Sequence, residues 1–136
     1  MSVPLSKRKT GELKVITDAR RVTARVVTIA SNEKHFPKRL RWCYTSRIVD
    51  ACVKMFVEIN EANSVFVKTA EDISKRIGHW KEAQVCCTAC IALVDLSFDL
   101  RQVSLETTES LIADLVKVRQ LIRSRITSDT RRFTHG

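Results

Sequence analysis

Three cysteines stand close together in the second half of the chain and are the first candidates for chemistry. Cys86, Cys87 and Cys90 include the spacing Cys87-x-x-Cys90, which suits two ligands of a zinc ion. A structural zinc site needs four ligands, and the sequence contains no second pair of this form. Cys87 also has a core position in the helix that its neighbours predict. We therefore interpret these residues, with Cys43 and Cys52, as small apolar side chains, and we expect no metal and no cofactor.

The other reactive side chains form no recognisable catalytic set. His35 has no Asp or Asn placed to orient it, and no Gly-rich loop offers an oxyanion hole. Asp95 and Asp99 lie one helical turn apart and could act as paired carboxylates. Such pairs are common on helix surfaces, so we expect an exposed ion-pair network with Arg101 instead, and His79 at a solvent-exposed turn. Without a phosphate-binding loop or nucleophile elbow, we expect no catalysis and no small-molecule substrate.

Positive charge is concentrated at the two ends of the chain. Residues 1–41 contain 11 Lys and Arg against 3 Asp and Glu, residues 42–116 contain 7 against 11, and residues 117–136 contain 6 against 1. Solubility alone would not require this segregation, whereas a polyanion such as RNA or DNA binds a basic face. The charge distribution therefore favours nucleic acid as a partner.

The densest basic segment is Ser31–Arg47, which we call the basic corner. Pro37 suits the first position of a helix and keeps Phe36 out of helical conformation, so the chain should turn here. Taken singly, each charged residue of the corner also fits a plain solvated helix start. Tyr44 has a core position. For Trp42, stacking on a base of a single strand and a contact between subunits are equal alternatives.

Four amphipathic segments predict an all-α protein. The 136 residues include only three Gly and two Pro, and no segment has the alternating pattern of a strand. Apolar residues recur every three or four positions, which predicts helices over about residues 12–31, 37–66, 70–98 and 105–126. Thr69 has the position of an N-cap for the third helix. A break near Gly78, after a long connection over residues 68–77, is the alternative for that helix.

The third helix has a long and regular apolar stripe. Its expected core positions are Ile73, Ile77, Trp80, Gln84, Cys87, Ile91, Val94 and Phe98. The stripe of the second helix extends to Phe66, which predicts a helix on the order of 40 Å long.

Four long helices with short connections should pack as an antiparallel up-down four-helix bundle. This topology brings the basic corner and the connection between the third and fourth helices to one end. It also makes the first and fourth helices neighbours, so that their arginines can form one basic strip. The candidate nucleic-acid-binding residues of the corner and the strip are Arg20, Arg21, Arg25, Lys34, Lys38, Arg39, Arg41, Arg119, Arg123 and Arg125.

The chain divides into three parts. We expect residues 1–11 to be a disordered basic arm, residues 12–129 to form the bundle, and residues 130–136 to be a basic tail. The odd number of cysteines and the lack of an apolar signal segment predict a cytoplasmic protein with reduced thiols. The longest uncharged apolar run, Val85–Val94, is far shorter than the roughly 20 residues that cross a bilayer, so we expect no membrane partner.

The basic corner and two later segments resemble a known family. The corner contains N-E-K-H-F-P-K-R-L-R followed by T-S-R-I, and the segments I-N-E-A-N and K-E-A come later. Together they resemble the Avd-like four-helix-bundle proteins, the accessory variability determinants of diversity-generating retroelements. These are related in fold to proteins encoded in ribosomal RNA intervening sequences. The similarity extends over about residues 12–129.

The resemblance implies a homopentameric, barrel-like assembly that binds nucleic acid. It also implies association with the reverse transcriptase of the element during mutagenic copying of a template RNA, without catalysis by the accessory protein itself. The family motif carries over to residues 36–39 and to Arg41, whereas Arg119 and Arg123 rest on charge and geometry. The three cysteines of the third helix depart from the family pattern, which leaves the identity of the partner open.

The leading hypothesis is a non-enzymatic accessory protein that binds RNA or DNA phosphates without sequence readout and associates with a reverse transcriptase. The alternative is a structural oligomer whose basic strip binds an acidic protein and no nucleic acid. Apolar residues outside the four stripes, including Val27, Trp42 and Val116, favour self-association, and a closed ring of five subunits is expected.

Overall fold

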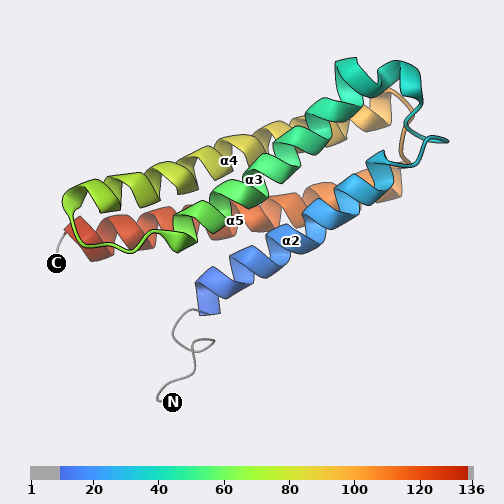
Figure 1. Ribbon diagram of the computed structural model, residues 1–136. Coiled ribbons are helices and arrows are strands. Elements are labelled where there is room, and N and C mark those ends of the chain that lie inside the picture. Colours follow the sequence, from blue (N-terminus) through green and yellow to red (C-terminus); the bar gives the residue numbers. More distant parts are fainter. Residues whose placement is uncertain (1–9, 135–136) are drawn as a thin grey trace, which may run out of the picture.

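Four long helices make up the described part of the chain (Figure 1). The computed structural model describes residues 10–134, which contain no strand. The helices are α2 (Thr10–Ala30), α3 (Ser46–Ser64), α4 (Ala70–Asp99) and α5 (Leu105–Thr134), with a 3₁₀ turn η1 (Lys38–Leu40) and a π-helical turn η2 (Arg41–Thr45) between α2 and α3. Within this range, no helix is both long enough and apolar enough to cross a membrane.

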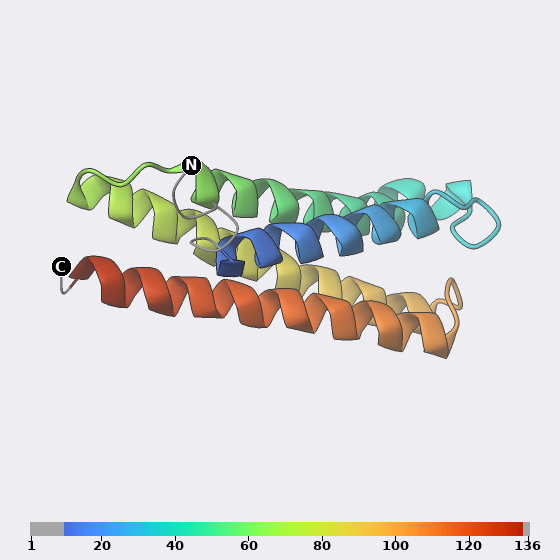
Figure 2. The same cartoon turned by 90° about the horizontal axis from the view of Figure 1, so that it is seen from below.

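The helices alternate in direction along the chain and close into a bundle. Each packs against the next in sequence, and α2 also packs against α5. The α2–α3 connection and the α4–α5 turn lie at the same end (Figures 1 and 2), as the up-down topology predicts. Because α2 has 21 residues and α5 has 30, α2 accompanies α5 over only part of its length (Figure 2).

The core is continuous across all four helices. Periodicity predicts inward faces for the first and fourth helices that end at Ile29 and Ile126. Those two residues are half-buried, and the other predicted positions are buried: Val15, Ala19, Val22 and Val26 of α2, and Leu111, Leu115, Val118 and Ile122 of α5. They pack with Ile48, Met55 and Ile59 of α3 into one cluster. Apolar periodicity therefore predicts these three faces correctly.

The buried face of α4 differs from the predicted stripe. Trp80, Cys87 and Val94 are buried as expected, but Ile73 and Ile77 are only half-buried. The remaining buried positions are Arg76, Ala83, Cys86, Cys90 and Ser97. Apolar residues occur on almost every side of α4, so spacing alone could not identify the inward face. Two polar side chains are included because each has a hydrogen-bond partner inside the bundle.

The second predicted helix begins in helical turns at Lys38, as predicted, but its regular α-helical part starts later and it ends earlier than predicted. Regular α-helix begins at Ser46, after the η1 and η2 turns, and ends at Ser64. Phe66, predicted to lie in the core, is 77% exposed because the backbone becomes extended at Val65. The predicted length on the order of 40 Å is therefore wrong.

The third predicted helix begins where its cap predicts. The backbone N–H of Asp72 donates to Thr69 Oγ1 at 3.2 Å, and the N–H of Thr69 donates back to Asp72 Oδ2 at 3.1 Å. Backbone donors at Lys68 and Thr69 also lower the pKa of the Asp72 carboxyl. The helix continues through Gly78, so the alternative of a break there is wrong.

The predicted boundaries at the two ends of the chain also shift. Residues 130–134 belong to α5 and not to a tail, and α2 already begins at Thr10. The rest of the predicted arm and tail, residues 1–9 and 135–136, lies outside the described residues.

A buried carboxylate joins three helices at the end opposite the basic corner. Asp129 Oδ2 accepts hydrogen bonds from Arg76 Nε at 2.7 Å and from Trp80 Nε1 at 2.9 Å. Its Oδ1 lies 3.6 Å from Arg125 Nη2. Arg76 Nη1 also donates to the carbonyl of Ala62, near the end of α3, at 3.2 Å. The network therefore fixes α4 against both α3 and α5.

Replacing Asp129 by Ala should lower the free energy of unfolding by about 3–5 kcal/mol, because a buried guanidinium would lose its paired carboxylate and a buried indole N–H would lose its acceptor. Urea unfolding followed by circular dichroism measures the loss. The matched control is Asp95→Ala on the exposed side of α4, which should leave the transition midpoint unchanged. A loss of less than about 1 kcal/mol for Asp129→Ala would contradict the role of this network.

Candidate nucleic-acid interface

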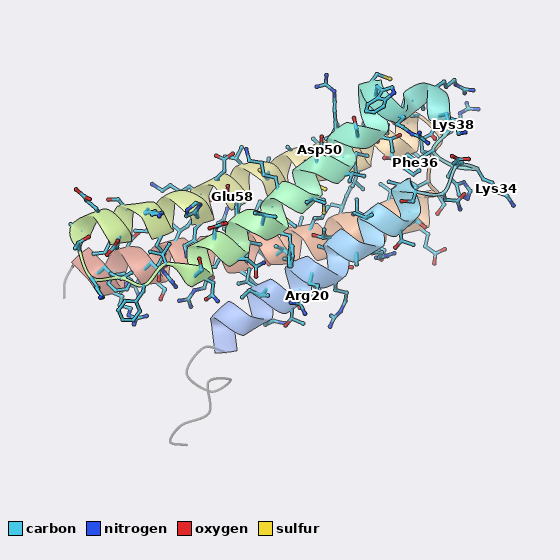
Figure 3. All side chains as sticks on the ribbon, in the orientation of Figure 1. Arg20, Lys34, Phe36, Lys38, Asp50 and Glu58 are labelled. Atoms are coloured by element: carbon cyan, nitrogen blue, oxygen red, sulfur yellow. The ribbon has the colours of Figure 1, made fainter. Side chains whose placement is uncertain are left out.

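The basic corner presents five exposed cations. Lys34, Lys38, Arg39, Arg41 and Arg47 are all exposed. Of these five residues, only Arg41 has a carboxylate partner within residues 10–134, namely Glu33 at 3.4 Å. Figure 3 shows Lys34 and Lys38 extending from the same end of the molecule. Four cations are thus left to bind phosphates, which is the contact that positions proteins on nucleic acids.

Two aromatic residues of the η2 turn have opposite environments. Tyr44 is buried, and its hydroxyl hydrogen-bonds to the carbonyl of Leu93 and to Ser97. Burial raises the pKa of Tyr44, so the phenol stays protonated as a donor. Trp42 is 82% exposed. Tyr44 therefore anchors the corner to α4, and Trp42 is free to contact a ligand.

Phe36 is a second anchor of the corner. It is buried, and its ring is nearly parallel to that of Tyr44, with 6.4 Å between the ring centroids. The sequence assigns Phe36 to the interface only through the family motif. An aromatic residue directly before Pro37 is the signal that could have indicated its structural role, because the turn there brings its side chain back to the bundle.

The α2 part of the predicted basic strip is largely neutralised. Arg21 lies 3.9 Å from Asp18, and Arg25 lies 3.2 Å from Asp114 while it also donates to Ser110 at 2.9 Å. Arg20 is exposed, and Figure 3 places it on α2, away from the corner. The flank between α2 and α5 therefore holds ion pairs, which weakens it as a polyanion site.

Two arginines of α5 lie elsewhere than predicted. Arg119 is half-buried against α4, where Nη1 donates to Thr88 Oγ1 at 3.4 Å. Arg125 is half-buried and contacts the buried Asp129. The prediction that both share a flank with α2 is therefore wrong, because their rotation around α5 turns them toward α4 and the core. Arg123 is exposed.

The second half of α5 carries a basic face that the sequence did not predict as a separate surface. A shallow hollow there is lined by Arg123, Ser124, Thr127, Ser128, Arg131 and Arg132. Lys117 precedes it on the helix and is exposed. The signal for this face is the absence of Asp and Glu from residues 117–128. The single strip predicted from sequence is thus two separate basic surfaces, the basic corner at one end and the α5 face toward the other.

The buried cysteines are packed as core residues. Cys87 Sγ donates to the carbonyl of Leu115 at 3.2 Å, and burial raises the pKa of its thiol to about 12. The hydrogen bond with Cys52, together with burial, raises the pKa of Cys90. Cys43 is exposed. In the described part of the chain, no group of three or more His, Cys, Asp or Glu side chains could hold a metal ion.

Two expectations for the remaining titratable residues are wrong. His79 does not lie at a solvent-exposed turn, since its Nδ1 is 2.6 Å from Glu58 Oε2 and both side chains are mostly buried. Asp95, Asp99 and Arg101 are exposed, but none of them forms an ion pair with another residue of the range 10–134. Neither arrangement provides a general acid and base pair on a cleft wall.

The comparisons with known proteins support the fold. No family model matches the sequence, and no curated protein matches it. A solved structure is similar with a TM-score of 0.72 and 17% identity, over 86% of this chain and 98% of that chain. It is the crystal structure of a protein of unknown function from the S23 ribosomal protein family, from Bacteroides thetaiotaomicron VPI-5482. At this identity, the likeness shows a shared fold alone.

A thiol reagent should modify a single cysteine of the native protein rapidly, because Cys43 is exposed and the other four thiols are buried. The Ellman reaction at pH 8 counts the fast thiols, and Cys43→Ser should remove the fast phase. All five should react in denaturant. Loss of helical circular dichroism with a chelator, or a second fast thiol that appears only with a chelator, would instead indicate a metal site at Cys86, Cys87 and Cys90.

Proposed function

We propose that this protein is a non-enzymatic, nucleic-acid-binding accessory protein whose primary contact surface is the basic corner. The observation that carries the proposal is the 82% exposed indole of Trp42 among four exposed cations that have no carboxylate partner within residues 10–134. A single-stranded nucleic acid offers both phosphates for the cations and unpaired bases for the indole. An RNA or DNA single strand is therefore the ligand that fits the corner.

The corner fits this role better than the other cationic surfaces. On the α2 flank, Arg21 and Arg25 already pair with carboxylates, and a phosphate would have to compete with them. The α5 face has exposed arginines and hydroxyls but no exposed aromatic of its own in its hollow. It supports the corner as a second phosphate-binding surface without base stacking.

Association with a retroelement reverse transcriptase belongs to the same proposal. Its support is the resemblance of residues 32–41, 45–48, 59–63 and 81–83 to the Avd-like proteins. In that role, the protein would hold template RNA or its cDNA copy near the polymerase. Copurification of the protein with a reverse transcriptase encoded beside it tests this part separately from nucleic-acid binding.

Assembly into a homo-oligomer, with five subunits as the resemblance implies, is also proposed. Its support is an apolar face on the outward side of α4, where Val85, Ala89, Ala92 and Leu96 recur at intervals of three and four and are all exposed. Val27 and Val116, which the sequence predicted as exposed apolar residues available for self-association, are half-buried. A face of this kind on α4 would be covered in a symmetric assembly.

Changing Lys34, Lys38 and Arg39 together to Gln should weaken binding of single-stranded RNA and flatten the dependence of log affinity on log salt by about 2, because each phosphate contact contributes roughly 0.7. Filter binding of labelled RNA across a salt series measures both quantities. Thermal unfolding should change little, since the three side chains are exposed.

The matched control removes the same charge from another region, by changing Lys68, Lys75 and Lys81 to Gln. All three are exposed. The control should leave the salt slope unchanged. If the corner variant binds RNA with an unchanged slope and instead loses attachment to an acidic protein, the structural adaptor is the correct function.

A further inference from the structure

A cleft of about 1000 Å³ opens at the same end of the bundle as the basic corner. Its walls come from the last turns of α2 and the α4–α5 turn, with His35 of the basic corner at its edge. Clefts that hold small ligands or single nucleotides have volumes of roughly 300–1000 Å³. The cleft is therefore large enough for a nucleotide.

One wall of the cleft is apolar. Ile29, Phe98 and Val103 line it, and Phe98 is 42% exposed although it lies on the helix that contributes most to the core. A large aromatic side chain exposed inside a cleft provides a flat surface on which a base can stack.

The rest of the lining is polar. Two arginines, Arg25 and Arg101, and one carboxylate, Asp99, are its charged members. Arg25 is held in place by Ser110 and Asp114, so its guanidinium is fixed before a ligand arrives. Hydroxyls of Thr28, Ser104 and Thr107 complete the lining.

Arg101 occupies a backbone position that usually belongs to glycine. Its φ is 61°, and it is the single non-glycine residue with positive φ in the described chain. The N–H groups of Arg101 and Gln102 bond to the carbonyls of Phe98 and Ser97, which is the Schellman ending of a helix. Left-handed backbone is unfavourable for an arginine because its Cβ crowds the following carbonyl oxygen. A strained residue whose guanidinium lines a cleft is typical of a ligand site.

Gln102 gives a further indication of a ligand. It lines the cleft and is only 7% exposed, and its Oε1 has no hydrogen-bond partner within residues 10–134. Its Nε2 already donates to the carbonyl of Leu100. An orphan acceptor beside a cleft is satisfied when a ligand, or a water that it orders, supplies a donor.

We propose that this cleft binds one nucleotide, with its base against Phe98 and its phosphate at Arg101. The apolar wall excludes a site for inorganic phosphate alone, and the arginines exclude a site for an apolar ligand. Asp99 and Gln102 offer acceptors for the hydroxyl or amino groups that a nucleotide carries and a phosphate lacks. The nucleotide is either free or an unpaired member of a strand bound at the basic corner, and the second source rests on the proposed function.

Two variants test the cleft. Phe98→Leu keeps the apolar wall but removes the ring, so the affinity for a single-stranded RNA 12-mer should fall about five-fold or more with an unchanged salt slope. Arg101→Gly keeps the left-handed backbone without strain, so the protein should stay folded while the affinity falls and the slope flattens by about 0.7. The matched controls are Phe66→Leu at the other end of the bundle and Lys75→Gln, which should bind as the unmodified protein does.

A second measurement separates the two sources of the nucleotide. Titration with uridine or adenosine monophosphate, followed by the NMR resonances of the methyl groups of Ile29 and Val103, reports on the cleft without any strand and in every variant. If the monophosphate shifts these resonances, and Phe98→Leu weakens the binding of the monophosphate but not that of the strand, the site takes a free nucleotide. If strand affinity also falls, the site takes a nucleotide of the bound strand.

The results distinguish this inference from the proposed function. If neither variant changes strand or monophosphate binding while the corner triple variant weakens the strand, the cleft inference is overturned and the corner stands. If no strand binds at all but the monophosphate shifts the resonances of Ile29 and Val103, the proposed function fails and the cleft holds a free nucleotide.

Discussion

The fold depends on one buried carboxylate. Asp129 is fully buried and accepts from Arg76 and Trp80, which lie one turn apart on α4. A charge in this position is costly unless it is paired and hydrogen-bonded, so α4 must turn these two side chains toward α5. That constraint, together with the packing of Ala83, Cys87, Cys90 and Val94 in the core, sets the rotation of α4. It explains why the inward face includes Arg76 and Ser97 in place of the more apolar residues that periodicity favours.

The same rotation organises the far end of the bundle. With Arg76 inward, Ser97 also faces inward, about six turns further along α4, and hydrogen-bonds to Tyr44. Tyr44 in turn stacks on Phe36, so the basic corner is fastened on both sides of Pro37. The irregular η1 and η2 turns are then held by side-chain anchors although their backbone is not α-helical. Next to Ser97, Phe98 reaches the wall of the cleft. The buried network at one end and the anchors of the basic corner at the other thus depend on the same rotation of α4.

Local patterns in the sequence predicted much of the fold because they have local causes. The reciprocal cap at Thr69 and the stripes of α2 and α5 follow from residues three and four positions apart. The inward face of α4 could not be predicted, since the partner of Arg76 is 53 residues away along the chain. The candidate site was predicted only in part, because contacts between residues far apart in the sequence have no local signal. The exposed cations of the corner follow from composition, whereas the carboxylate partners of Arg21 and Arg25, and the turn of Arg119 toward Thr88, depend on helix rotation.

The central claim is that a nucleic acid binds at the basic corner, and the fluorescence of Trp42 tests it most directly. The protein has two tryptophans, of which Trp42 is exposed in the corner and Trp80 is fully buried. Titration of the protein with an unlabelled RNA single strand should quench the long-wavelength emission of Trp42, saturably and less strongly at higher salt, while the emission of Trp80 stays constant. Binding detected by anisotropy of a labelled strand, with no change in Trp42 emission, would contradict the claim.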